Sequence, residues 1–366
     1  MILALLLACV DPKPADPATA DSADTADPED PAAACPTGSH LDGETCVSAL
    51  TAWTEAPALD AARDHHLTLI EPVGDHAAVL VMAGTNARGR VNPKVERAWL
   101  EADGSLSAFE ALDSFEGAAI GQGLGRGASG SVLVGGLDDS GNSVADTFVL
   151  HVSEDGDPSF TAGPPLVETR YHATATAVGG FVYVIGGLNQ VYTAGEVSQE
   201  VLATVERAPF DGETLGAFET IGSLPDPSTH HAVWTWGTGL YLAGGGDGAR
   251  ARDTVLRAEL NADGSLGDWI QVGTLPEGRA TSAATVLADQ VFLVAGMAKL
   301  TGEERDTALR ADLSADGSVG EFEALTPLPT ARAHAHQAPI WQGWMVSAGG
   351  SIDHVVQDQV YVGALE

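Results

Sequence analysis

The chain has 366 residues, with 17 Lys and Arg against 51 Asp and Glu, and its formal net charge at pH 7 is −34. So acidic a chain is not expected to bind nucleic acid, because that binding depends on Lys and Arg neutralising phosphates, nor to adhere to anionic lipid through its own charge. Its apolar runs are shorter than the roughly 18 residues of a membrane span, and an acidic surface favours a solvated monomer.

A short apolar segment opens the chain. Residues 2–8 are apolar, the segment ends in Leu6-Leu7-Ala8-Cys9, and polar, proline-rich sequence follows at once. This pattern resembles the lipobox of bacterial lipoproteins, which implies a signal peptide over residues 1–8 and lipid attached to Cys9. Val10, rather than Asp, after the cysteine favours the outer membrane. We therefore expect a lipid-anchored protein of the cell envelope; the alternative is an N-terminal strand or helix of the folded domain.

Residues 9–34 have the composition of a tether. From position 10 onward they hold seven acidic residues, one lysine and otherwise mostly Ala, Pro, Thr and Ser. Such a segment buries too little apolar surface to offset its ordering entropy, so we expect a disordered, self-repelling linker.

Residues 35–50 contain Cys35 and Cys46, with glycine turns between them. Outside the cytoplasm this spacing favours a disulfide-bridged loop. A zinc site is the rival interpretation, but the two cysteines and His40 supply too few ligands for a closed centre.

From residue 51 onward one unit is repeated six times. Each copy has an apolar stretch that ends in a Gly-Gly or small-Gly pair, and successive pairs are 52, 51, 58, 51 and 54 residues apart. The second residues of the pairs are Gly84, Gly136, Gly187, Gly245, Gly296 and Gly350. A period of about 50 residues is typical of one four-stranded propeller blade.

Two further marks recur with this period. An aromatic residue opens a short strand in each unit, at Trp53, Phe109, Phe160, Phe218, Trp269 and Phe322. Ten residues later comes an equivalent inner position, occupied by Arg63, Ala119, Arg170, Ser228, Arg279 and Arg332. Asp-Gly pairs, a hairpin signal, precede five of the aromatics, whereas Trp53 has none. We therefore expect the N-terminal strand around Trp53 to complete the last blade and so remove two free sheet edges.

Together these marks resemble the kelch β-propeller family over residues 51–366. The resemblance implies an all-β fold, a six-bladed propeller closed by its N-terminal strand. The family's Gly-Gly, Tyr and Trp pattern is reduced here to one aromatic per unit, as in a divergent bacterial branch.

Arg-x-His occurs at the inner position of three units. These are Arg63-x-His65, Arg170-x-His172 and Arg332-x-His334, while two other units keep His230 and Arg279. Side chains two apart on a strand share a face, so we expect these eight residues to ring the channel mouth as a basic, ligand-binding spot. The alternative is a structural role, with each Arg and His bonding blade-to-blade turns and carbonyls.

Other chemistry has weaker support. The pairs His65-His66, His230-His231 and His334-x-His336 come from three units without a fixed carboxylate pattern, so we expect satisfied or solvated histidines and no metal or other cofactor. Residues 138–142 lack the spacing of a calcium loop. Residues 51–366 hold no cysteine, which excludes the Tyr-Cys chemistry of kelch copper radical oxidases such as galactose oxidase.

The function expected from the sequence is a non-catalytic binding or scaffold role for a protein or glycan at the envelope. The alternative is a carbohydrate-active enzyme, because the sialic-acid mutarotases are exported six-bladed kelch proteins. That alternative depends on the fold alone.

Overall fold

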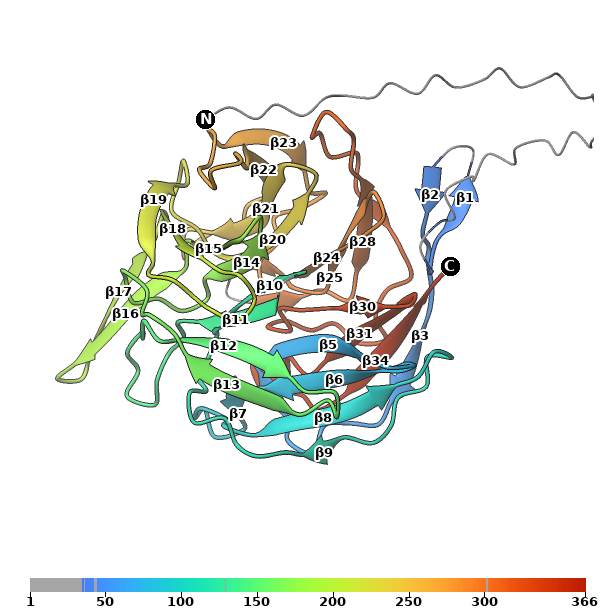
Figure 1. Cartoon of the computed structure of the whole chain (residues 1–366), viewed down its shortest axis with the longest axis horizontal. Coiled ribbons are helices and arrows are strands. Elements are labelled where there is room, and N and C mark those ends of the chain that lie inside the picture. The colour runs from blue at the N-terminus through green and yellow to red at the C-terminus, as the bar shows by residue number, and fades with distance from the viewer. Residues whose placement is uncertain (1–34, 36, 43–44, 129, 301) are drawn as a thin grey trace, which may run out of the picture. The chain divides into compact units, whose positions relative to one another are not determined.

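The computed structural model describes residues 35, 37–42, 45–128, 130–300 and 302–366. The expected signal peptide, the lipid site at Cys9 and the acidic tether lie outside them. The described residues form strands and turns without α-helices, and so contain no helix of the length and apolarity that crossing a membrane requires. Within Cys35–Glu366, six four-stranded antiparallel sheets form the blades of a propeller (Figure 1).

The blades follow one another in the order of the chain, and each runs from an inner to an outer strand. Blade 1 consists of β5 (Leu67–Val73), β6 (His76–Met82), β8 (Val95–Leu100) and β9 (Glu110–Ala111). Blade 2 consists of β10 (Gly123–Gly127), β11 (Gly130–Val134), β12 (Thr147–Val152) and β13 (Pro158–Ala162). Blade 3 consists of β14 (Thr174–Val178), β15 (Phe181–Ile185), β18 (Thr204–Pro209) and β19 (Glu219–Ser223).

The remaining blades repeat this arrangement. Blade 4 consists of β20 (Thr229–Trp236), β21 (Gly239–Gly246), β22 (Thr254–Glu259) and β23 (Ile270–Thr274). Blade 5 consists of β24 (Ala283–Leu287), β25 (Gln290–Val294), β28 (Ala308–Asp312) and β29 (Glu323–Ala324). Blade 6 consists of β30 (Ile340–Trp341), β31 (Trp344–Ala348), β34 (Val360–Leu365) and β3 (Leu50–Ala56).

Blade 6 joins the two ends of the propeller. Strand β3 pairs antiparallel with β34, with Trp53 opposite Gly363 and Ala56 opposite Val360. The expected closure by the N-terminal strand is therefore confirmed. It covers the edge that β34 would otherwise expose.

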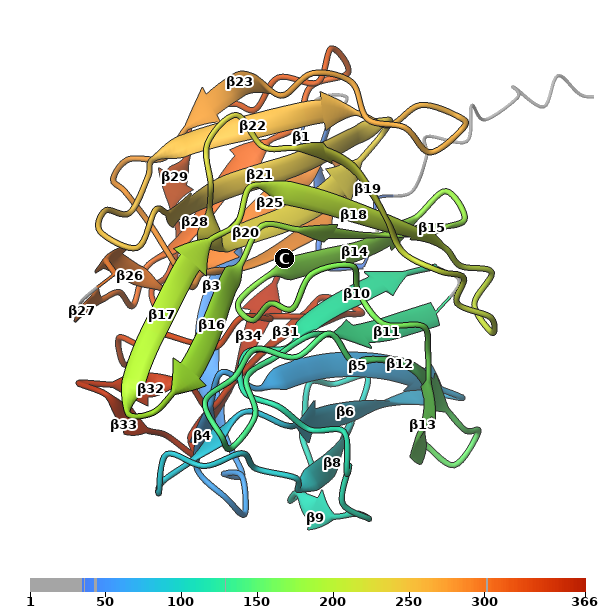
Figure 2. The ribbon, with the colours of Figure 1, turned by 90° about the vertical axis from the view of Figure 1, so that its left-hand side faces the viewer.

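Five short two-stranded ribbons accompany the blades. They pair β1 (His40–Asp42) with β2 (Thr45–Val47), β4 (Arg63–Asp64) with β7 (Thr85–Asn86), β16 (Leu188–Thr193) with β17 (Glu196–Val201), β26 (Met297–Lys299) with β27 (Gly302–Glu304), and β32 (Ser351–Ile352) with β33 (Val355–Val356). The last three ribbons lie on one side of the propeller (Figure 2). Cys35 and Cys46 form the expected disulfide next to β1 and β2.

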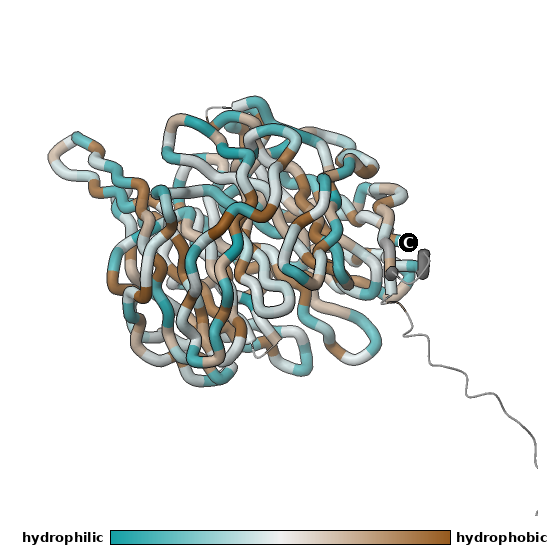
Figure 3. The backbone as a smooth tube through the Cα atoms, turned by 90° about the horizontal axis from the view of Figure 1, so that it is seen from above, coloured by the Kyte–Doolittle hydropathy of each residue, from teal (hydrophilic) through white to brown (hydrophobic). Residues whose placement is uncertain are grey.

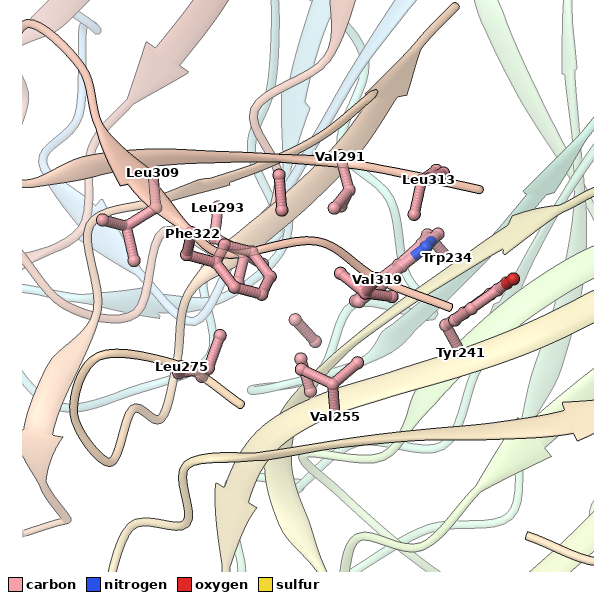
Figure 4. Close-up of a cluster of buried hydrophobic side chains, with 13 residues drawn as sticks. Trp234, Tyr241, Val255, Leu275, Val291, Leu293, Leu309, Leu313, Val319 and Phe322 are labelled. Atoms are coloured by element: carbon pink, nitrogen blue, oxygen red, sulfur yellow. The ribbon is translucent and has the colours of Figure 1, made fainter. Parts of the chain in front are cut away.

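The hydrophobic core is divided among the blade interfaces. Six buried clusters occur, and each combines side chains of two neighbouring blades. Between blades 4 and 5, for example, Trp234 and Val255 lie opposite Val291 and Phe322 (Figure 4). Hydrophobic stretches accordingly run through the strands and alternate with hydrophilic ones (Figure 3). Each blade is therefore stabilised by its neighbours, as in other repeat proteins.

The glycine pairs have a common backbone conformation. Both residues of all six pairs have positive φ, from Ala83 at 58° and Gly84 at 83° to Gly349 at 56° and Gly350 at 90°. The amide of each second glycine donates to the carbonyl at the Arg position of the next blade. Examples are Gly136 to Arg170, 2.8 Å, and Gly350 to Arg63, 2.9 Å. The repeated glycines thus serve a turn that bonds one blade to the next.

Candidate functional site

The residue two after each Arg position faces the centre of the propeller. It has a left-handed backbone in all six blades, and these residues are His65, Gly121, His172, His230, Thr281 and His334. A left-handed residue interrupts the alternation of a strand. The expectation that Arg and His share one strand face is therefore wrong. In blade 3, β14 begins only at Thr174, after both residues.

These six residues form a backbone ring around the central axis. Five of its links are hydrogen bonds from one blade to the residue of the preceding one: His65 to His334, 3.0 Å; Gly121 to His65, 3.0 Å; His172 to Gly121, 2.8 Å; His230 to His172, 3.4 Å; and Thr281 to His230, 2.8 Å. The ring fixes the backbone from which four imidazoles project.

The four arginines point away from this ring into the blades. Arg63, Arg170 and Arg332 are fully buried, and Arg279 is 3% exposed. Each donates through Nη1 to the carbonyl of the first residue in its own blade's small-Gly or Gly-Gly pair. These acceptors are Ala83 at 3.4 Å, Gly186 at 2.9 Å, Ala295 at 3.2 Å and Gly349 at 2.9 Å.

Acidic or hydroxyl groups complete the arginine contacts. Arg63 pairs with Glu96 and Arg170 with Glu206, and all four of these side chains are fully buried. Arg279 binds Glu277 at 2.9 Å. The four arginines of the expected basic spot therefore bond the glycine turns within the blades.

The histidines come together at the centre. His65 stacks on His334 with ring centroids 3.9 Å apart and on His172 at 4.8 Å, and His172 lies 3.9 Å from His230. His336 lies 6.0–6.5 Å from each of these four rings. We call these five residues the histidine cluster.

Three rings of the cluster have a polar neighbour at Nδ1, which is a hydrogen-bond partner for His230 and His334 and a nearby carboxylate for His65. In His65 this atom lies 2.9 Å from Asp64 Oδ1. In His230 it lies 3.1 Å from Thr229 Oγ1, and in His334 it lies 3.0 Å from Ser351 Oγ. One ring nitrogen from each of the three lies within 4.8 Å of the others. These rings therefore have fixed orientations around a common centre.

Four imidazoles of the cluster, those of His172, His230, His334 and His336, are uncharged at neutral pH. Burial lowers the pKa of His336 from 6.5 to about 3. Burial also holds the pKa of His172, His230 and His334 well below 6.5, and the neighbouring imidazoles act in the same direction. Burying an imidazolium in apolar surroundings is unfavourable. The channel end therefore carries neutral imidazoles in place of the expected basic spot.

A cavity of about 300 Å³ lies along the axis beside the cluster, and residues from all six blades line it. His172, His230 and His336 line it together with threonine, serine and glutamine side chains. Arg126 of β10 also lines it and binds Glu71 at 3.0 Å. The four buried arginines at the repeat position lie outside this central cavity.

Sequence reasoning did not identify Asp64, Arg126 or His336 as site residues. Arg126 and Asp64 have no counterpart in most units, so the repeat gave no signal for them. The sequence did contain one signal that the histidines point inward. Gly121 occupies the equivalent position in blade 2, and glycine is typical of left-handed backbone.

Comparison with known proteins supports the repeat interpretation. The "Rab9 effector protein with kelch motifs" of Rattus norvegicus is 32% identical over 126 residues, which is 34% of this chain and 32% of that protein. Its Mus musculus counterpart is 33% identical over 118 residues, or 31% of this chain and 28% of that protein. The matched stretch thus spans about a third or less of these relatives. No protein-family model matches the chain.

A solved structure supports the architecture. The structure titled "Structure of YjhT" superposes with a TM-score of 0.61 over 83% of this chain and 95% of that one, at 12% sequence identity. The chain therefore folds as a six-bladed β-propeller of the kelch type. The likeness to YjhT concerns the fold alone, since so low an identity carries no information on a ligand.

Proposed function

We propose that this kelch propeller is a non-catalytic binding protein that takes a sugar residue of a glycan into its central cavity. The observation that carries the proposal is a set of buried, unpaired polar atoms on residues that line the cavity. Thr68 Oγ1, Thr174 Oγ1 and Trp234 Nε1 are buried and have no hydrogen-bond partner among the described residues. Buried polar groups without partners cost about 1–3 kcal/mol each, so a hydrogen-bonding ligand there would be stabilised.

The shape and chemistry of the cavity fit a small polyhydroxylated ligand. Its volume of about 300 Å³ is at the lower end of ligand sites, which measure about 300–1,000 Å³. The hydroxyl groups of Thr176 and Thr235 add neutral donors and acceptors to the wall. Gln122 and Ser282 also line it, but their polar groups bond the backbone. Arg126 Nη1 is buried without a partner among the described residues. We propose that Arg126 binds the carboxylate of an acidic sugar.

The test is a thermal-shift and calorimetric screen of the full chain against neutral and acidic monosaccharides and short glycans. A ligand at 100 times its Kd adds about 2.7 kcal/mol of stability. We expect a hit that Thr174→Val weakens and that Thr161→Val, on the exposed outer strand β13, leaves unchanged. If Arg126→Gln lost binding of acidic sugars but kept binding of neutral ones, Arg126 would be the residue that contacts the carboxylate. A flat screen would contradict the proposal and direct the search to a protein partner by crosslinking on intact cells.

A second candidate function is a carbohydrate-active enzyme of the sialic-acid mutarotase kind. It is favoured by the neutral imidazoles of His172 and His230 in the cavity wall, since a neutral imidazole accepts a proton. The anomer interconversion rate of a bound sugar, followed by proton NMR, separates the two functions. Turnover lost in His172→Gln at unchanged melting temperature supports the enzyme. Binding without rate enhancement supports the binding protein.

We also propose that the chain is anchored in the envelope, at the outer membrane, by lipid on Cys9. The disulfide between Cys35 and Cys46 is consistent with an oxidising compartment. Membrane fractionation and intact-mass measurement of the Cys9→Ala protein test the anchor. The anchor would be excluded if the Cys9→Ala protein stayed in the membrane fraction and if it and the unaltered protein both had the mass of an unlipidated chain.

A further inference from the structure

The histidine cluster has an arrangement that sugar binding does not require. Five imidazoles from four blades are packed around one centre, and each ring is at least half buried against its neighbours. Both ring nitrogens of His172 and Nε2 of His336 are buried without hydrogen-bond partners among the described residues. Leaving buried nitrogens unpaired is unfavourable, so each such atom in a folded protein requires an explanation.

We propose that His65, His230 and His334 bind one divalent transition-metal ion of the zinc class at the centre of the propeller. One ring nitrogen from each residue lies within 4.8 Å of the others. Three nitrogens bonded to zinc at about 2.0–2.1 Å in tetrahedral geometry are about 3.4 Å apart. The rings therefore need to move inward by less than about 1 Å to reach bonding distance, which side-chain rotation provides.

Second-shell contacts support this assignment of ligands. Thr229 and Ser351 hydrogen-bond the Nδ1 atoms of His230 and His334, and Asp64 Oδ1 lies 2.9 Å from Nδ1 of His65. Metal-binding histidines almost always have the second ring nitrogen bonded in this way, which fixes ring orientation and raises basicity. The Nε2 atoms are thereby left for the metal.

The donor set selects the class of metal. Imidazole nitrogen suits zinc, copper, nickel and iron, whereas calcium and magnesium require carboxylate or carbonyl oxygens. Three histidines with a further open position are the ligand set of catalytic zinc sites. His336 lies 6.0–6.5 Å from the other four rings and lines the cavity. The ring of His172 is closer, 3.9 Å from that of His230 and 4.8 Å from that of His65, so among the imidazoles outside the ligand set it is the nearest to two of the three proposed ligands.

The experiment uses the full chain, prepared without a polyhistidine tag, treated with a chelator and then titrated with ZnCl₂. We expect one zinc per chain by elemental analysis after desalting, a saturable calorimetric signal and a higher melting temperature. Co²⁺ in place of Zn²⁺ should give a visible absorption spectrum of nitrogen coordination at the same stoichiometry. No sugar is present, so the result is independent of the proposed glycan function.

Variants assign the site. His65→Gln and His334→Gln are expected to lose at least about 100-fold in zinc affinity, and Asp64→Asn about 10–100-fold. His151→Gln, which alters a histidine on β12 outside the cluster, is the matched control and should bind as the unaltered chain does. A purely structural role for Asp64 would change the melting temperature without changing zinc affinity.

Two results would overturn the proposal. One is an unaltered chain that retains much less than one zinc and gives no nitrogen-ligand Co²⁺ spectrum. The other is zinc affinity in His65→Gln and His334→Gln equal to that of His151→Gln. If the two ligand variants do not fold, the Co²⁺ spectrum of the unaltered chain and the zinc affinity of Asp64→Asn decide the question.

Discussion

The hydroxyl of Tyr183 in blade 3 donates a 2.9 Å hydrogen bond to the carbonyl oxygen of Gly264 in blade 4. Gly264 belongs to an Asp-Gly turn, and a Cβ there would lie 2.5 Å from Phe181 of blade 3. Arg207, stacked over Phe181, donates to the carbonyl of Asp263 at 3.0 Å. The Asp-Gly turn of one blade therefore docks on an aromatic and an arginine of the preceding blade.

Tyr183→Phe should destabilise the protein by about 1 kcal/mol, because it leaves the Gly264 carbonyl without its donor. Tyr241→Phe provides a repeat of the test, since the Tyr241 hydroxyl bonds the Gly317 carbonyl at 3.2 Å in the next pair of blades. Tyr192→Phe, which changes an exposed side chain on β16, is the control. Urea unfolding of the three variants measures the effect. Equal stability of Tyr183→Phe and Tyr192→Phe would contradict the docking role.

Arg170→Ala should lower the free energy of unfolding by about 3–5 kcal/mol, because it leaves the Glu206 carboxylate buried and unpaired. The change also frees the Gly186 carbonyl, which Arg170 binds at 2.9 Å. Arg88→Ala removes an exposed arginine and is expected to have little effect.

The same pair of variants separates a structural arginine from a ligand-binding one. We expect ligand affinity of the folded fraction to be unchanged in Arg170→Ala. A loss of affinity at full stability would restore the role that the sequence pattern predicted.

The blade count, the closure and the positions of the Asp-Gly turns could be predicted because each depends on a local backbone requirement that recurs. Left-handed glycine pairs, Asp-Gly turns and a core aromatic leave fixed spacings in the sequence. The direction of the histidines could not be predicted in this way. A single left-handed residue, such as His172 at a φ of 48°, turns its side chain to the axis and sends the neighbouring Arg170 into the blade.

The composition of the central site also depends on contacts between blades far apart in sequence. The rings of His65 and His334 stack with centroids 3.9 Å apart, although 269 positions of the sequence separate the two residues. Asp64 lies 2.9 Å from the His65 ring of the first blade, and Ser351 bonds the His334 ring of the last. No spacing rule within one repeat contains this information, so only the closed ring shows which histidines meet.

The Asp-Gly turns should give the protein a measurable acid response. Ser265 donates to Asp263 Oδ1 through Oγ at 2.7 Å and through its amide at 2.9 Å, and these bonds lower the pKa of Asp263 below 3.8. A lowered pKa stabilises the folded state at pH values above the unfolded pKa, and that contribution is lost as the pH falls through the folded pKa.

Carboxyl titration by NMR measures this pKa directly. Ser265→Ala should raise the pKa of Asp263 toward 3.8 and reduce the pH dependence of stability below pH 4. Ser318→Ala, which removes the equivalent bond to Asp316, should leave Asp263 unchanged. An Asp263 pKa equal in the parent protein and in Ser265→Ala would show that the serine does not stabilise the carboxylate.

Substitution of two glycines of blade 3 measures two separate losses of stability. One comes from forcing alanine into a left-handed backbone, and the other from the close approach of neighbouring backbone at the blade-to-blade turn. Gly179 has a φ of 61° with open space around a built Cβ, so Gly179→Ala should cost about 1–2 kcal/mol for the left-handed backbone alone. Gly187 has a φ of 98°, and its Cβ would lie 2.8 Å from the Tyr171 carbonyl. Gly187→Ala should therefore cost about 1–3 kcal/mol more than Gly179→Ala, because the backbone of Tyr171 must shift. Chemical denaturation of both variants gives the difference, and equal costs would mean that the close approach at Gly187 does not restrict the sequence.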